Sequence, residues 1–146
     1  MIAAPHVIRA QDAATFPLGV LSMRLLAGHG DTDDAFAVAE FTGSEGAWTV
    51  PHVHQLGEES FYVLDGSFTF DVGLDEVEVG AGAFLLIPRG TRHQMRAHAG
   101  GGRLLTLWTP GGPEEMFKEL SALPGGSIRD PEVRRALAAR FDSVPV

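Results

Sequence analysis

The chain has 146 residues, a length typical of one domain, and 45% of them are hydrophobic, as in ordinary globular proteins. Its formal net charge is −8, and no basic stretch could neutralise a phosphate backbone, so we expect no nucleic-acid partner. The absence of cysteine excludes disulfides, thiolate metal sites and cysteine nucleophiles.

The N-terminal segment, MIAAPHVIRAQDAATF, lacks the basic start and the continuous apolar run of a signal peptide. No later segment approaches the roughly 18 consecutive apolar residues that a membrane-spanning helix needs. We therefore expect a cytoplasmic protein with no membrane partner.

Short apolar runs divided by glycine, proline and acidic turns fill the chain from residue 7 to residue 109, which is typical of β-strands. Asp65-Gly66 lies between two of these runs and predicts a two-residue hairpin turn. Many short strands at regular spacing indicate an all-β sandwich or barrel, and we expect a small jelly-roll β-barrel over about residues 7–109. The predicted strands cover residues 20–27, 35–42, 50–55, 61–64, 67–72, 77–79, 84–87, 92–97 and 104–108.

The hydrophobic period changes after residues 110–113, and two short C-terminal helices are predicted between about residues 113 and 141. Asp130 supplies an N-cap for the second helix and Pro131 its first residue. We expect both helices to pack on the outside of the barrel, so that residues 1–146 form a single domain. The apolar stripe of the first helix consists of Met116, Phe117, Leu120 and Leu123.

Three histidines and one carboxylate are spaced so that a single metal ion could bind all of them. His52 and His54 are two apart on a predicted strand, so their side chains share a face. Glu59 begins the next alternating run, and His93 begins another. If these faces line one cavity, they form a site for one divalent transition metal. Imidazole and carboxylate ligands suit iron, manganese, nickel, zinc or copper.

Two stretches of the chain resemble the two motifs of the cupin superfamily. Residues 46–66 match the first motif, and residues 82–93 match most of the second. Residues 51–70 and 107–112 also look like the single-domain bacterial cupins of the quercetin 2,3-dioxygenase-like group. The second motif commonly carries asparagine where this chain has Ala97, but that asparagine is not a metal ligand in the family.

The resemblance implies a metal site with four protein ligands, which leaves two positions of an octahedral shell open. The family admits a glutamate at position 58 or 59. Strand alternation favours Glu59, which shares its face with Phe61 and Val63. Glu58 would point to the opposite face with Ser60. The implied ligands are His52, His54, Glu59 and His93.

The same alternation predicts an apolar pocket around the metal, which suits a small aromatic or hydrophobic ligand. The alternative is that these side chains simply fill a small barrel. The other histidines, His6, His29 and His98, lie at the terminus or beside glycine turns and are interpreted as surface or packing residues. The expected wall residues are Phe61, Val63, Phe68, Phe70, Phe84 and Met95.

The favoured function is a mononuclear metal-dependent dioxygenase, similar to quercetinases, that acts on a small aromatic or enolisable substrate. In that reading Glu59 is both a metal ligand and a catalytic proton acceptor, as the resemblance implies. The alternatives are a non-catalytic cupin that binds or senses a small molecule, a metal-dependent isomerase or lyase, and a cupin that has lost its metal. The apolar residues Tyr62 and Leu64, predicted to face outward, suggest a homodimer.

Overall fold

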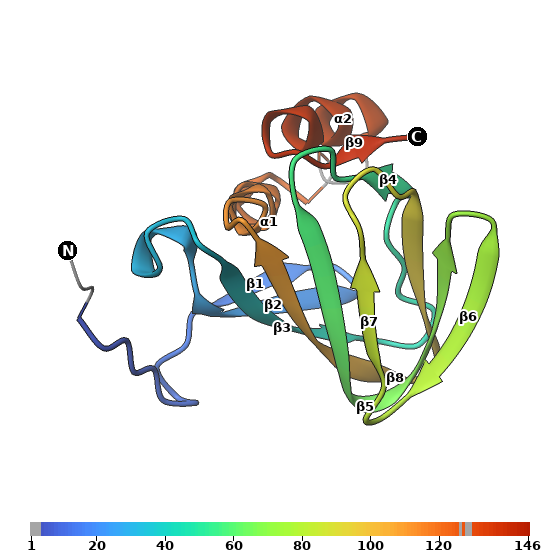
Figure 1. Ribbon diagram of the computed structural model, residues 1–146, viewed down its shortest axis with the longest axis horizontal. Helices are drawn as coiled ribbons and strands as arrows, with labels where there is room; N and C mark the ends of the chain where they lie inside the picture. Colours follow the sequence, from blue (N-terminus) through green and yellow to red (C-terminus); the bar gives the residue numbers. More distant parts are fainter. Residues whose placement is uncertain (1–3, 126, 128–129) are drawn as a thin grey trace.

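Two long strands, β5 and β8, form the frame of the fold in the computed structural model (Figure 1). Among residues 4–125, 127 and 130–146, which the structure describes, nine strands pair into one curved sheet that closes as a jelly-roll barrel. The elements are β1 (Thr15–Leu18), β2 (Leu21–Ala27), a 3₁₀ turn (His29–Asp31), β3 (Ala37–Gly43), β4 (His52–Val53), β5 (Glu58–Val72), β6 (Asp75–Gly80), β7 (Phe84–Ile87), β8 (His93–Thr109), α1 (Glu114–Ala122), α2 (Pro131–Arg140) and β9 (Val144–Pro145).

The register of β5 and β8 explains how one sheet closes into a barrel. The first half of β5 pairs with β7 and with the second half of β8, whereas its second half pairs with β6 and with the first half of β8. On its other side β8 pairs with β3 and, through its first residue, with β4. The all-β jelly-roll prediction is therefore confirmed.

The predicted hairpin at Asp65-Gly66 is wrong, because β5 continues through both residues. Gly66 has a φ of 73°, and a Cβ on it would lie 2.2 Å from the carbonyl oxygen of Gly101. The register with β8 shifts on either side of Gly66, so this left-handed glycine makes a bulge that bends the strand rather than a turn that ends it. Gly101 has a φ of 70° and likewise bends β8 where two separate strands were predicted.

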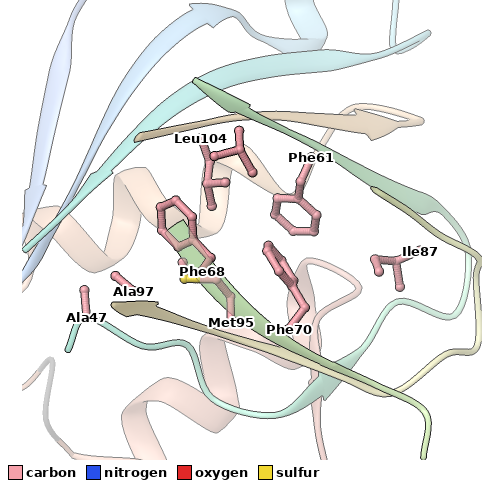
Figure 2. Packing of buried hydrophobic residues seen from close by; sticks show 9 residues of the cluster. Ala47, Phe61, Phe68, Phe70, Ile87, Met95, Ala97 and Leu104 are labelled. Carbon is pink, nitrogen blue, oxygen red and sulfur yellow. The ribbon is translucent and has the colours of Figure 1, made fainter. Parts of the chain in front are cut away.

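The hydrophobic core lies between the two halves of the barrel. Figure 2 shows Phe61, Phe68 and Phe70 pointing toward Leu104 and Met95 from β5 and β8. The ring of Phe61 lies 4.9 Å from that of Phe70 and 6.5 Å from that of His93, so the core extends directly to the histidines.

The two C-terminal helices are confirmed, but they do not simply pack on the outside of the barrel. The Asp130 side chain accepts a hydrogen bond from the backbone N–H of Glu132 at 2.9 Å and caps α2 as predicted. Helix α1 packs on β1 and β3, and α2 packs on α1 and β9. Together they lie over the end of the barrel at which β4 and β9 meet (Figure 1). Neither helix in the described part of the chain is long and apolar enough to cross a membrane.

Candidate metal centre

The structure brings the four predicted ligands together at the helix-covered end of the barrel. Four potential ligand atoms all lie within 4.8 Å of one another, one each from His52, His54, Glu59 and His93. Oε2 of Glu59 lies 2.8 Å from Nε2 of His93, 2.9 Å from Nε2 of His54 and 3.8 Å from Nε2 of His52. All but the half-buried His52 are buried.

Three strands position these side chains. His52 on β4 and His93 at the start of β8 are direct partners across the sheet. Glu59 is the second residue of β5, and its side chain points inward with that of Phe61. Glu58 points away and approaches Arg89 at 3.4 Å on the surface, so the structure places Glu59 rather than Glu58 in the cluster.

A hydrogen bond at Nδ1 orients each imidazole. Because a carbonyl oxygen only accepts, each Nδ1 carries a proton, so an imidazole that gives up its other ring proton offers a metal ion the lone pair of Nε2, which faces the centre of the cluster. Such outer hydrogen bonds are the usual support of histidines that bind metals. The three pairs are His52 Nδ1 with the Val50 carbonyl at 2.7 Å, His93 Nδ1 with the Thr91 carbonyl at 3.0 Å, and His54 Nδ1 with the Asp142 carbonyl at 2.6 Å.

This donor set fits a transition metal ion. Three imidazole lone pairs and a carboxylate converge on one point, and acceptors at such short distances repel unless a positive charge lies among them. Imidazole nitrogen with one carboxylate oxygen suits first-row transition metals, whereas calcium prefers shells of oxygen only. The cluster can therefore hold one such ion, with His52, His54, Glu59 and His93 as its protein ligands.

The pKa values of Glu59 and His54 are each shifted in the direction that favours the charged form. Burial alone would raise the pKa of Glu59, but the charge of His54 and the hydrogen bonds of the imidazoles hold it well below its usual range. Burial would lower the pKa of His54, but the charge of Glu59 and the hydrogen bond to it raise this pKa above its usual value. Glu59 is therefore an ionised acceptor at neutral pH.

Asp142, in the segment after α2, supports the loop between His54 and Glu59. Its carboxylate accepts hydrogen bonds from the backbone N–H groups of Gln55 at 2.7 Å, Leu56 at 2.9 Å and Gly57 at 3.2 Å. Sequence reasoning missed this residue, since no motif surrounds it and the contact spans more than 80 residues.

A cavity of about 770 Å³ extends from the histidine cluster to the C-terminal helices. Its wall includes Phe61 and Met95 from the predicted set, together with Met116, Phe117 and Leu120 of α1. The helices thus contribute to the cavity, which the sequence did not indicate.

The other predicted wall residues lie elsewhere. Val63, Phe68 and Phe70 are buried in the barrel core and are not among the cavity-lining residues, which agrees with the packing alternative. Phe84 is 65% exposed, so its placement in the pocket is wrong. It pairs directly with Tyr62 across β5 and β7, and direct cross-strand partners share a face, here the outer one.

Two cavity-lining residues carry buried donors. Oγ1 of Thr106 and Nε1 of Trp108 have no hydrogen-bond partner within the described ranges of the chain. The ring of Trp108 packs 6.0 Å from that of Phe41 in the second core cluster. Its indole N–H nevertheless adds an unsatisfied donor to the wall.

The remaining histidines are satisfied by other contacts. His98 bonds to the hydroxyls of Ser67 and Thr69, and His6 bonds to the Leu26 carbonyl. His29 lies near the carboxylates of Glu114 and Glu115, a second group of possible metal ligands. The Glu114 carboxylate, however, already accepts the backbone N–H groups of His29 and Gly112, both at 2.6 Å, and so joins α1 to the preceding loops.

Comparison with known proteins agrees with this geometry. The cupin-domain family model matches residues 40–110, the stretch that carries all four clustered residues. The chain contains a cupin domain. Over 142 residues, 97% of its length, this cupin is 29% identical to quercetin 2,3-dioxygenase of Bacillus subtilis (strain 168), but it spans only 41% of that relative.

Two solved structures show the same fold in chains of similar size. The polyketide cyclase RemF from Streptomyces resistomycificus is 27% identical, with a TM-score of 0.64 over 83% of this cupin and 95% of RemF. KdgF from Halomonas sp. gives a TM-score of 0.67 over 73% of this cupin and 94% of KdgF, and at 16% identity it supports the fold alone.

Proposed function

We propose that this cupin is a mononuclear metal-dependent dioxygenase that acts on a small aromatic or enolisable substrate. The observation that carries the proposal is the cluster of three imidazoles and Glu59, whose Nε2 lone pairs converge at one end of the 770 Å³ cavity. The similarity to quercetin 2,3-dioxygenase over 97% of the chain supports the oxygenase class. A transition metal ion bound by the cluster would supply Lewis acidity and redox chemistry.

The protein groups would prepare the substrate. Glu59 lies at the cavity end where a phenol or enol would bind, so its carboxylate is the group placed to accept the hydroxyl proton. Phe61, Met95 and Phe117 form an apolar wall that suits an aromatic ring and excludes water. The unpaired donors on Thr106 and Trp108 favour a ligand that carries oxygen acceptors.

Oxygen uptake tests the proposal. Protein loaded separately with iron, manganese, nickel, copper or zinc is assayed with quercetin, catechol and acetylacetone, with flavone as the control that lacks the hydroxyl. We expect at least one metal form to consume oxygen with a hydroxylated or enolisable compound and none to consume it with flavone. If no combination of metal form and test compound consumes oxygen, the dioxygenase proposal is contradicted.

A metal-dependent cyclase or isomerase is the second candidate, and the 27% identity to the polyketide cyclase RemF over 95% of that protein favours it. Both functions use an enolate held at the same cluster. Loss of substrate, followed by chromatography with and without oxygen, separates them, because a cyclase or isomerase converts its substrate at an undiminished rate when oxygen is removed. Binding of these compounds without conversion would favour a sensing or carrier role.

We further propose that the protein works in the cytoplasm as a homodimer of single-domain subunits. The barrel and the helices pack as one unit, since Phe117 of α1 lies 5.0 Å from Phe41 of β3. An exposed apolar patch, defined by Tyr62, Phe84 and Leu86, lies on the outer face of β5 and β7 and would pair two subunits.

A further inference from the structure

Two arginines of α2, Arg134 and Arg135, line the cavity. Arg134, in the first turns of α2, lines the cavity together with the ligand cluster. Its guanidinium carbon lies 5.6 Å from the centroid of the Trp48 ring, which lines the same cavity. Arg134 and Trp48 therefore form one polar section of a largely apolar wall.

The guanidinium of Arg134 lacks an anionic partner. No hydrogen bond or ion pair reaches it from the residues that the structure describes, whereas the adjacent Arg135 pairs with Glu132 and Arg140 pairs with Glu119. A cation over the face of the Trp48 ring uses none of its N–H groups as hydrogen-bond donors to that ring, so the N–H groups of Arg134 remain available to a planar anion. Burial lowers the pKa of Arg134 from its usual value, in line with its half-buried position in the cavity wall.

We infer that Arg134 binds an acidic group of the ligand, so that the substrate is an aromatic or enolisable compound that also carries a carboxylate. This inference rests on the proposed function, which places the hydroxyl of the substrate at Glu59. A planar carboxylate matches the two parallel N–H groups of a guanidinium. The cavity of about 770 Å³ is large enough for a bicyclic acid that reaches from the cluster to α2.

Binding of two matched probes tests this inference. The compounds are 6-hydroxy-2-naphthoate and its methyl ester, which differ only in the charge at the end remote from the hydroxyl. Their affinities are measured by calorimetry on zinc-loaded protein, so that no redox turnover occurs. We expect the wild type to bind the acid about tenfold more tightly than the ester, as suits a charge-assisted pair.

Substitutions of arginines on α2 test whether Arg134 causes the preference for the acid over the ester. Arg134→Gln should abolish the preference for the acid and leave the affinity for the ester unchanged. Arg140→Gln removes the same charge from an exposed arginine of α2 that pairs with Glu119 and does not line this cavity, and it should change either affinity by less than about twofold. Arg134→Lys keeps the charge without the planar fork and should retain part of the preference. Zinc content and the thermal unfolding midpoint establish that each variant is folded and loaded.

The inference fails if wild-type protein binds both probes equally or binds neither at millimolar concentration. It also fails if Arg134→Gln and Arg140→Gln weaken acid binding to the same extent, since that would indicate only a general loss of charge. The proposed reaction is tested separately by oxygen uptake. If Arg134→Gln loses the preference for the acid but no metal form of the wild type consumes oxygen, the dioxygenase proposal is contradicted. The inference that Arg134 binds an acidic group would still hold.

Discussion

The backbone carbonyl of Asp142 accepts a hydrogen bond from Nδ1 of His54 at 2.6 Å, while the carboxylate of the same aspartate holds the loop that follows His54. One residue of the C-terminal segment thus fixes both the orientation of an imidazole in the cluster and the path of the chain from His54 to Glu59. This contact makes the segment after α2 part of the candidate metal centre.

Asp142→Ala should weaken metal binding although it removes no ligand. The substitution leaves the N–H groups of Gln55, Leu56 and Gly57 without their acceptor, so we expect about 10-fold weaker metal affinity. Unfolding free energy should also fall, by about 1–3 kcal/mol. Competition with a chelator and thermal unfolding measure the two effects.

Asp33→Ala is the matched control for Asp142→Ala. Asp33 is exposed and has a φ of 55°, against 54° for Asp142, so alanine is strained to a similar degree at both positions. A loss of metal affinity that is equal in the two variants would show that backbone strain, and not the lost carboxylate, is responsible.

His54→Ala should abolish most metal uptake and leave a folded barrel. The side chain contributes one of four donors but lies outside the hydrophobic core clusters, so the strands keep their packing. Metal analysis and circular dichroism measure both properties. His98→Ala, at a histidine bonded to Ser67 and Thr69 away from the cluster, should keep its metal. Full metal content in His54→Ala would exclude it as a ligand.

Glu59→Gln should reduce turnover more than metal binding. The amide oxygen can still coordinate an ion, but it cannot accept a proton, and loss of a general base lowers rates by about 100-fold or more. Steady-state oxygen uptake and metal content are compared on the same preparation. Glu58→Gln alters the neighbouring surface carboxylate and should leave both unchanged. Equal losses of turnover rate and metal content in Glu59→Gln would indicate that Glu59 acts only as a metal ligand and not as a base.

His29 should make stability depend on pH near neutrality. The hydrogen bond to Asp34, aided by the charges of Glu114 and Glu115 and opposed by slight burial, raises the pKa of His29 above 6.5. A raised pKa in the folded state stabilises the protein below pH 6.5, and this contribution is lost as pH rises through the folded value. The stability difference between wild type and His29→Gln should therefore shrink from pH 5.5 to pH 9. A constant difference in chemical unfolding would contradict this assignment.

Light scattering should show a homodimer, a species of twice 15.6 kDa. Phe84 and Tyr62, paired across β5 and β7, are 65% and 43% exposed, and we expect the second subunit to cover them. Phe84→Asp should give monomers. Leu74→Asp, at a fully exposed leucine in the turn between β5 and β6, should remain dimeric. A wild-type species near 16 kDa at micromolar concentration would refute the homodimer.

Strand alternation and the resemblance to the cupin motifs together predicted the cluster. A period of two fixes which side chains share a face, so it gives the common face of His52 and His54 and the parity of Glu59 with Phe61, whereas the resemblance joined these residues with His93 in one site. Alternation could not place Phe84, because no ligand on β7 indicates which of its faces is the inner one.

The tertiary structure decided what depends on distant partners. A glycine with positive φ, such as Gly66, serves in a hairpin turn or in a bulge, and only the pairing of β5 with β8 selects the bulge. Asp142 and Arg134 lie far along the chain from the histidine motif and have no motif of their own. Asp142 reaches His54, and Arg134 reaches the cavity, because β9 pairs with β4 and brings the C-terminal segment back to the barrel, a long-range contact that local sequence preferences do not encode.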